Sequence, residues 1–246
     1  MDEKLMLATQ VLSLIDLTSL NTNDTDQEII QLCGKARNQF GQVAALCVFP
    51  QFIETALDSL HSHHIKGVRV ATVSNFPHGK NNPSITHKEV EKAVLMGAQE
   101  VDVVFPYSAF MAGDTKIAEE LVVASKDACS SGVKLKVILE TGALKTERLI
   151  RQASELCIEH QADFLKTSTG KVSINATYDA ASFMLDTIKQ SGKNVGFKAS
   201  GGIRNLMQAS EYMSMASNIM GDNWVCADNF RFGASSLLDD LITELQ

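Results

Sequence analysis

The stretch KLKVILE (134–140) lies between EVDVVFP (100–106) and DFLKTST (163–169), and these three runs together decide the fold. Each is short and mainly aliphatic or β-branched, as is typical of buried parallel strands. Five similar runs occur elsewhere: LSLIDLT (12–18), VAALCVF (43–49), VRVATVS (68–74), NVGFKAS (194–200) and RFGAS (231–235). Successive runs start 25 to 37 residues apart, and a strand, a helix and two loops need roughly 30 residues. Eight such units predict an α/β fold, a (β/α)₈ TIM barrel.

The segments between these runs carry helical signals. Thr25-Asp-Gln-Glu28 and Thr86-His-Lys-Glu89 read as capping boxes that start helices. We expect a short N-terminal helix at 2–10, and the first run could be the end of that helix. Crossover helices are expected near 26–38, 51–64, 86–97, 115–131, 146–160, 176–191, 204–218 and 236–245. An open doubly wound sheet shares this alternation and is the alternative architecture.

Composition limits the classes of function open to the chain. Its 246 residues suit one barrel of about 250 residues, so we expect a single domain over 1–246. A formal net charge of −7 disfavours nucleic acid as a partner. Five cysteines without a Cys-x-x-Cys pair argue against a disulfide framework or a structural zinc site. With no signal-peptide pattern and no run of about 18 apolar residues, we expect a cytoplasmic protein without a membrane partner.

Four charged residues on the predicted strands point to a site, because unpaired charge inside a strand is costly. They are Asp102, Lys136, Lys166 and Lys198. Three lysines with one aspartate would leave excess positive charge in the barrel. This arrangement favours catalysis over a purely structural role, although a buried Lys–Asp ion-pair network that holds the strands together is the alternative.

Lys166 and Lys198 fall on neighbouring predicted strands, which lie about 4.8 Å apart in a sheet. Strand alternation puts Gly196 on the face of Lys198, where it would leave room near the barrel axis. Burial and a second ammonium group both disfavour the charged form of an amine, and only the neutral amine is nucleophilic. We therefore interpret Lys166 as the nucleophile and Lys198 as its electrostatic activator, with Asp102 moderating the charge and passing protons.

The loops after the sixth, seventh and eighth predicted strands contain residues suited to an anion. In barrels this rim often binds phosphate through backbone N–H groups at a helix start. Glycine pairs let the backbone approach the anion, and hydroxyl and cationic side chains add donors. The pattern predicts a phosphate site made by Gly170, Lys171, Gly201, Gly202, Arg204, Gly233, Ser235 and Ser236.

Two other sequence features could indicate a nucleotide site and a metal site, but we expect neither. Thr169-Gly-Lys171 is similar to the end of a P-loop, but that motif needs a glycine where this chain has Leu165, which argues against an NTPase. His61, His63 and His64 lie late on a predicted outer helix with no suitably spaced carboxylate. We expect a solvated helix end there and no metal site.

Longer motifs lie at 16–18, 45–47, 71–79, 100–106, 164–171, 196–202 and 232–236. Together they resemble the deoxyribose-phosphate aldolase family. The resemblance runs from about residue 10 to about residue 240, and Lys166-Thr-Ser-Thr-Gly170 is its most specific part. It implies reversible cleavage of 2-deoxy-D-ribose 5-phosphate to acetaldehyde and D-glyceraldehyde 3-phosphate, without a metal or other cofactor.

The resemblance also implies roles for individual residues. Lys166 would form the Schiff base, and Asp102 and Lys198 would assist proton transfer. The other candidates at the substrate are Asp16, Thr18, Cys47 and Lys136, besides the predicted phosphate site. For Cys47 the alternative is a small buried packing residue. The family implies a cytoplasmic homodimer that acts in deoxynucleoside breakdown.

Some relatives carry a C-terminal tail that ends in tyrosine and is thought to deliver protons. This chain ends at Gln246, and its tyrosines are Tyr107, Tyr178 and Tyr212, so the group that completes proton transfer stays open. Rival interpretations are another Schiff-base barrel such as a transaldolase or keto-acid aldolase, an isomerase with Asp102 as base, and a sugar-phosphate sensor. A destabilised buried amine gives a sensor no advantage, which argues against that rival.

Overall fold

Eight parallel strands close into a barrel in this computed structural model, which describes residues 3–129 and 132–245. The order around the ring is β1-β10-β9-β8-β7-β6-β5-β4. This closed ring confirms the predicted TIM barrel and excludes the open doubly wound sheet. The barrel strands are β1 (Ile15–Ser19), β4 (Ala45–Val48), β5 (Arg69–Ser74), β6 (Glu100–Val104), β7 (Lys134–Ile138), β8 (Phe164–Lys166), β9 (Gly196–Ser200) and β10 (Phe230–Ala234).

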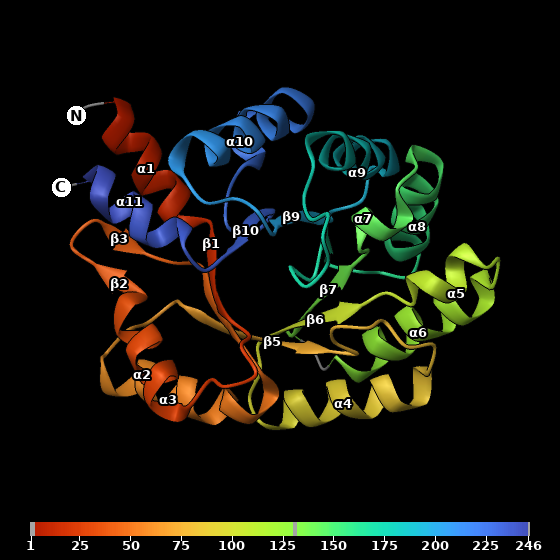
Figure 1. The fold of residues 1–246 in the computed structure, drawn as a ribbon, viewed down its shortest axis with the longest axis horizontal. Coiled ribbons are helices and arrows are strands. Elements are labelled where there is room, and N and C mark those ends of the chain that lie inside the picture. The colour runs from red at the N-terminus through yellow and green to blue at the C-terminus, as the bar shows by residue number, and fades with distance from the viewer. Residues whose placement is uncertain (1–2, 130–131, 246) are drawn as a thin grey trace.

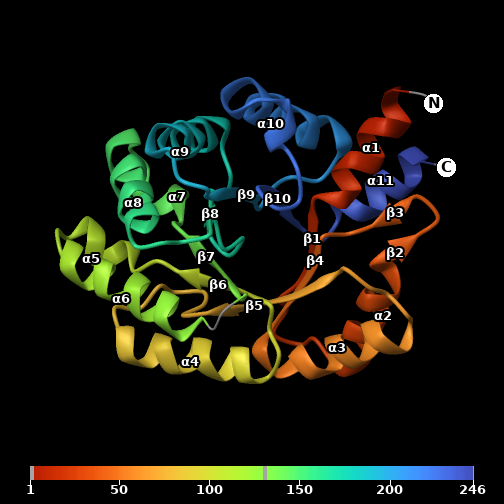
Figure 2. The same ribbon diagram turned by 180° about the vertical axis from the view of Figure 1, so that it is seen from behind.

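Helices surround the ring of strands on its outside (Figure 1), and the view from behind shows the same arrangement (Figure 2). The N-terminal helix α1 (Glu3–Ser13) packs against α11 (Leu237–Leu245), so the two ends of the described chain lie side by side. The other long helices are α2 (Asp26–Lys35), α3 (Ile53–Ser62), α4 (Pro83–Leu95), α6 (Thr115–Ala128), α8 (Glu147–Glu159), α9 (Tyr178–Ser191) and α10 (Leu206–Met220).

Several short elements were not predicted. The antiparallel pair β2 (Arg37–Asn38) and β3 (Gly41–Gln42) cuts short the helix expected at 26–38, because the Asn38 side chain accepts a hydrogen bond from Phe40 N and forms a turn. The remaining short elements are α5 (Tyr107–Met111), α7 (Thr141–Leu144) and the 3₁₀ turns η1 (Pro50–Phe52) and η2 (Asp222–Trp224).

The ends of several elements differ from the predictions. Helix α1 extends to Ser13 because Val11 and Leu12 are buried on its inner face, so the first strand starts at Ile15 rather than at residue 12. The sixth predicted strand (163–169) is regular only over β8, and its second half is a loop. Residue 2 of the expected N-terminal helix and residues 130–131 of the helix expected at 115–131 lie outside the described residues.

One predicted capping box is confirmed and the other is wrong. Thr25 and Glu28 cap α2 reciprocally, as expected. Helix α4 instead begins at Pro83, with Asn82 as its N-cap, so Thr86 lies inside the helix. Proline suits the first helical position because its backbone needs no N–H donor there. Glu89 is then free to accept hydrogen bonds from the loop after β5.

Alternation along the strands separates two environments. Outward residues such as Val101, Val103 and Val137 pack under the helices in one large apolar core. Inward residues of the same strands carry charge, since Asp102 alternates with Val101 and Val103 on β6. The strands therefore hold a candidate site inside the barrel while their other face stabilises the fold.

Candidate active site

Lys166 and Lys198 point into the barrel and share one carboxylate oxygen. Lys166 Nζ lies 2.8 Å from Asp102 Oδ2, and Lys198 Nζ lies 2.9 Å from the same atom. Their Cα atoms are paired in the register of β8 with β9. The two ammonium nitrogens are therefore near neighbours, as the sequence pattern predicts.

Lys136 lies on the other side of Asp102. Its Nζ is 2.8 Å from Asp102 Oδ1, 2.6 Å from Glu100 Oε2 and 3.4 Å from Asp16 Oδ2. All four of these side chains have no exposed surface. The structure thus surrounds Lys136 with carboxylates and leaves it no contact with the open cavity at the barrel mouth.

Asp16 connects the lysines to an arginine that the sequence analysis missed. Its Oδ2 accepts a hydrogen bond from Lys198 Nζ at 2.5 Å, and its Oδ1 accepts one from Arg231 Nη1 at 2.6 Å. Arg231 Nη2 also lies 3.2 Å from Glu100 Oε1. Glu100 and Arg231 could have been found, because each is a charged residue inside a predicted strand at the alternation that faces the barrel.

The buried cluster contains one more cation than carboxylates. Within the described residues the carboxylates are Asp16, Glu100 and Asp102, and the cations are Lys136, Lys166, Lys198 and Arg231. Arg69, which is partly exposed, reaches Glu100 at 3.6 Å from the end of the barrel. A neutral Lys166 would leave the buried charges balanced, which reduces the cost of burying them.

The surroundings divide the lysines into two kinds. Burial lowers the pKa of Lys166, and Lys198 lowers it further, so that Asp102 does not restore its ordinary value. Burial would also lower the pKa of Lys198, but Asp102 and Asp16 outweigh it and raise that pKa. The pKa of Lys136 is raised by its carboxylates in the same way. Lys166 is therefore the amine that loses its proton most readily, and burial is a larger cause than the crowding by Lys198.

The opposite wall of the barrel interior is apolar. Ala45 and Cys47 of β4 pack with Ala71 and Val73 of β5. Burial, and next Asp102, raise the pKa of the Cys47 thiol, which favours its uncharged form. These properties fit the packing interpretation of Cys47 better than a reactive thiol.

Gly196 faces the barrel interior as predicted, but it leaves no empty space. A Cβ atom at this position would lie 2.4 Å from the ring of Phe164. The aromatic ring therefore fills the room near Gly196 and closes the base of the cluster. Substitution of Gly196 would push Phe164 against its neighbours.

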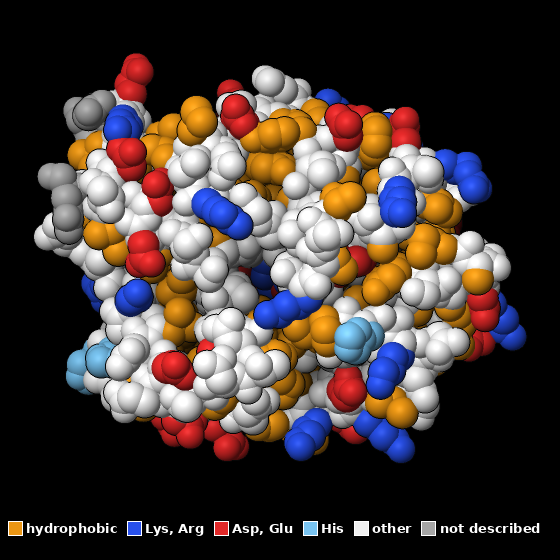
Figure 3. Space-filling view, in the orientation of Figure 1, with side chains coloured by type: hydrophobic (Ala, Val, Ile, Leu, Met, Phe, Trp, Pro, Cys, Tyr) orange, Lys and Arg blue, Asp and Glu red, His pale blue; other side chains and the backbone are white. Residues whose placement is uncertain are grey.

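A cavity of about 450 Å³ opens at the carboxyl ends of β1, β8, β9 and β10. Gly233 connects it to the charged cluster, because a Cβ atom there would lie 3.0 Å from Lys198 Cε. The space-filling view shows a hollow near the middle of one face, with Lys or Arg side chains beside it (Figure 3). Every predicted phosphate residue lines this cavity, together with Thr18: Gly170, Lys171, Gly201, Gly202, Arg204, Gly233, Ser235 and Ser236.

The three loops around this cavity differ in the donors that they offer. Gly170 N donates to Ser168 Oγ, and Lys171 N donates to Thr169 Oγ1. Lys171 Nζ crosses to Leu20 O at 2.8 Å. The backbone donors of Gly170 and Lys171 are thus occupied within the loop after β8, and the Lys171 side chain joins this loop to the loop after β1.

The loops after β9 and β10 combine two features that suit an anion. Gly201 and Gly202 have φ values of +86° and +87°, a backbone conformation that glycine adopts without strain. Ser235 and Ser236 directly precede the nine-residue helix α11, whose N-terminal N–H groups favour a negative charge. A phosphate between these loops would be held mainly by backbone donors.

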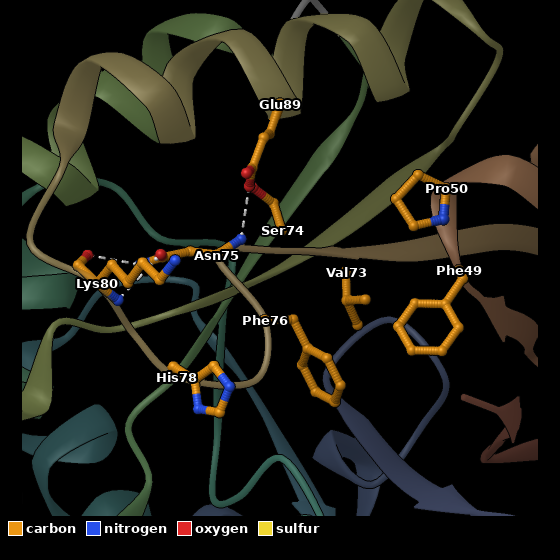
Figure 4. A pocket seen from close by; sticks show the side chains of 9 residues that line it. All are labelled: Phe49, Pro50, Val73, Ser74, Asn75, Phe76, His78, Lys80 and Glu89. Atoms are coloured by element: carbon orange, nitrogen blue, oxygen red, sulfur yellow. Dashed lines mark hydrogen bonds between the residues drawn. The ribbon is translucent and has the colours of Figure 1, made fainter. Parts of the chain in front are cut away.

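A second, smaller cavity of about 230 Å³ lies at the rim next to the apolar wall (Figure 4). The rings of Phe49 and Phe76 face each other there with centroids 6.0 Å apart. On its polar side, Glu89 Oε2 accepts hydrogen bonds from Ser74 Oγ and Asn75 N. Glu89 therefore fixes the loop after β5, which explains why it is not the capping residue expected from the sequence.

The histidines set aside in the sequence lie away from the barrel interior. His61 is in the last turn of α3, and His63 and His64 follow it on the surface. Within residues 3–129 and 132–245, no group of three or more His, Cys, Asp or Glu side chains has an arrangement suited to a metal ion. The same residues contain no helix with the length and apolar character to span a membrane.

Comparisons with a family model and with solved structures point to the same family of aldolases. Residues 10–241 match the model of the DeoC/LacD family aldolases. The aldolase QR15 is 30% identical, with 95% of this chain and 96% of that chain covered and a TM-score of 0.76.

Two further solved structures share the fold. A Toxoplasma gondii ME49 protein, provisionally named a deoxyribose-phosphate aldolase, is 21% identical over 98% of this chain and 95% of its own, with a TM-score of 0.90. A deoxyribose phosphate aldolase from Aeropyrum pernix, described as tetrameric, is 23% identical over 98% and 96%, with a TM-score of 0.75. With residues 10–241 covered by the family model, this chain belongs to the DeoC/LacD family of aldolases.

Proposed function

We propose that the protein cleaves 2-deoxy-D-ribose 5-phosphate reversibly to acetaldehyde and D-glyceraldehyde 3-phosphate through a Schiff base on Lys166. The observation that carries this proposal is the buried amine of Lys166, which shares Asp102 with Lys198. A neutral amine in a water-poor site is a nucleophile for a carbonyl carbon. Family membership and the similarity to deoxyribose-phosphate aldolases give further support.

The chemistry needs one nucleophile and one proton carrier. The Lys166 nitrogen attacks the aldehyde carbon of the open-chain sugar, and loss of water gives an iminium ion. The bond between the second and third carbons of the sugar then breaks as the proton of the hydroxyl on the third carbon is removed, and the electron pair of that bond forms an enamine on the two-carbon fragment. Protonation of the enamine carbon and hydrolysis release acetaldehyde and restore the amine.

Asp102 and Lys198 are suited to carry these protons. Asp102 contacts all three lysines, and the pKa of its carboxyl is held well below the ordinary range despite burial. Lys198 keeps its proton, because its own pKa is raised, so the pair enters the reaction as a carboxylate and an ammonium group. We propose that this pair acts as acid and base, with bound water as relay, whereas Lys136 holds Asp102 in place.

The mouth cavity supports a substrate with a phosphate at one end. The loops after β9 and β10 would bind the phosphate, while Thr18 and Lys171 line the same cavity. Thr18 Oγ1 donates to Asp16 O at 2.8 Å, which fixes its position beside the cluster. Binding energy from the phosphate would then align the carbonyl carbon with Lys166.

Reductive trapping tests this proposal. The protein is incubated with acetaldehyde, a hydride donor is added, and the modified residue is mapped by mass spectrometry. We expect one adduct, on Lys166, and cleavage of the sugar phosphate that is insensitive to EDTA. An adduct elsewhere, no adduct, or activity lost with EDTA would reject the proposal.

Substrate comparison separates this function from a transaldolase. A transaldolase moves a three-carbon ketone fragment and would accept fructose 6-phosphate as donor. We expect turnover of the deoxyribose phosphate and none of the ketose phosphate. An isomerase that uses Asp102 as base would give no adduct with either carbonyl compound.

Location and assembly follow from the same proposal. We propose a cytoplasmic enzyme of deoxynucleoside breakdown that forms a homodimer, as the family resemblance implies. Light scattering on the purified protein measures the assembly directly. A mass near 26.8 kDa would contradict the dimer, and four times that mass would match what is described for the Aeropyrum pernix protein.

A further inference from the structure

Two charged residues at the barrel floor, Arg231 and Glu100, have no part in the proposed chemistry, yet they contact Asp16 and Lys136, which in turn contact Lys198 and Asp102. Arg231 is 2% exposed and Glu100 is fully buried. Arg231 contacts Asp16 at 2.6 Å and Glu100 at 3.2 Å through different nitrogens. Arg231 and Glu100 are not among the residues that line the mouth cavity, and neither are Lys166, Lys198 and Asp102.

A chain of buried contacts joins this floor to the proposed nucleophile. Asp16 accepts from Arg231 through one oxygen and from Lys198 through the other. Lys198 and Lys166 then meet at Asp102. Because the whole path is shielded from water, a charge at the floor acts on the amine far more strongly than it would at the surface.

The groups that face the two ends of this path of buried contacts come from seven strands. Lys166 is faced by Asp102 of β6, Lys198 of β9 and Cys47 of β4. Around Arg231 and Glu100 lie Asp16 of β1, Lys136 of β7, Phe164 of β8 and, at the end of the barrel, Arg69 of β5.

We propose that Glu100 and Arg231 are positioning residues that set, in opposite directions, the pH at which Lys166 becomes nucleophilic. The inference rests on the proposed function of Lys166. Loss of the Glu100 charge leaves the cluster with more excess positive charge, which favours a neutral Lys166 at lower pH. Loss of the Arg231 charge does the reverse.

The test measures the rate of Schiff-base trapping on Lys166 from about pH 6 to about pH 10, a range that includes the titration of a lysine with a lowered pKa. The proteins are the wild type, Glu100→Gln, Arg231→Met and the double variant, with acetaldehyde and cyanoborohydride as reagents. We expect the midpoint of the rate profile to move by about one pH unit, downward for Glu100→Gln and upward for Arg231→Met. The double variant should return close to the wild type.

Two control variants separate charge from folding. Lys134 Nζ lies 5.4 Å from the centre of the Phe164 ring but is partly exposed, so Lys134→Met should leave the midpoint unchanged because water screens its charge. Arg231→Lys keeps the charge and should keep the midpoint, even where lost geometry slows the reaction. Thermal melts check that each variant is folded.

The outcomes distinguish this inference from the proposed function. A wild type without an adduct on Lys166 rejects the proposed function itself. A wild-type adduct with unchanged midpoints in both variants, or with shifts in the same direction, rejects only the roles of Glu100 and Arg231. Should Arg231→Met not fold, a midpoint in Glu100→Gln that does not move downward still overturns the inference.

Discussion

The two halves of the barrel interior have opposite chemistry. Strands β6 to β10 and β1 bring charged side chains into mutual contact, whereas β4 and β5 contribute small or apolar ones, apart from Arg69 at the end of the barrel. In the charged half the side chains pair with one another, and the apolar half excludes water from the barrel interior. The difference shows how one amine can be kept neutral: it needs charged neighbours for balance and an apolar wall for desolvation.

The largest effect is expected from removal of the Lys166 amine, which lies between the charged half and the apolar half. Lys166→Met should lower aldolase activity by about 10⁴-fold or more, because the nucleophile is lost. Sugar-phosphate cleavage and adduct formation measure this loss. Lys116→Met on α6, which is largely exposed, is the matched control and should keep full activity.

Lys166→Met should also be more stable than the wild type near neutral pH. The pKa of Lys166 in the fold lies below its ordinary 10.5, so the unfolded chain binds a proton that the folded one releases. Its cost to stability is full below the folded pKa and fades as the pH rises to 10.5. Denaturant melts at two pH values check this, and a variant less stable than the wild type at pH 7 would contradict it.

Removal of Lys136 tests whether the buried carboxylates depend on the buried cations for charge balance. Lys136→Met leaves Asp16, Glu100 and Asp102 short of one cation, and we expect a loss of about 3–5 kcal/mol in the free energy of unfolding. Denaturant titration measures it. A loss within about 0.5 kcal/mol, as is usual at the surface, would show that water reaches the cluster.

Removal of Lys198 tests its charge alone. Lys198→Leu raises the pKa of Lys166, because one nearby cation is gone while Asp102 stays. Trapping on Lys166 should then slow by about tenfold at pH 7 and by less at pH 9, because a larger share of the amine is neutral at the higher pH. Equal slowing at both pH values would indicate that Lys198 acts only through geometry.

The smallest effect is expected in the apolar half. Cys47→Val replaces a buried thiol with a side chain of similar size, so stability should change by less than about 1.5 kcal/mol and activity by only a few-fold. Thermal melts and the cleavage assay test this. A complete loss of activity with an intact fold would mean that the thiol takes part in the reaction.

The sequence by itself determined the barrel and indicated most residues of the candidate site. The spacing of apolar runs fixes the number of strand–helix units. Asp102, Lys166 and Lys198 stand out inside predicted strands because burial of a charge costs free energy. The glycine and serine loops could be recognised for a similar reason, since only a few residue types suit a close approach of backbone to an anion.

Only the tertiary structure decided which charges meet. Arg231 is 131 residues from Glu100 and 215 from Asp16 along the chain, and ring closure between β1 and β10 brings them together. Local pattern also could not show that Ser168 and Thr169 occupy the donors of their own loop, nor that Asn82 rather than Thr86 starts α4. These choices depend on hydrogen bonds and burial that exist only once the barrel has closed.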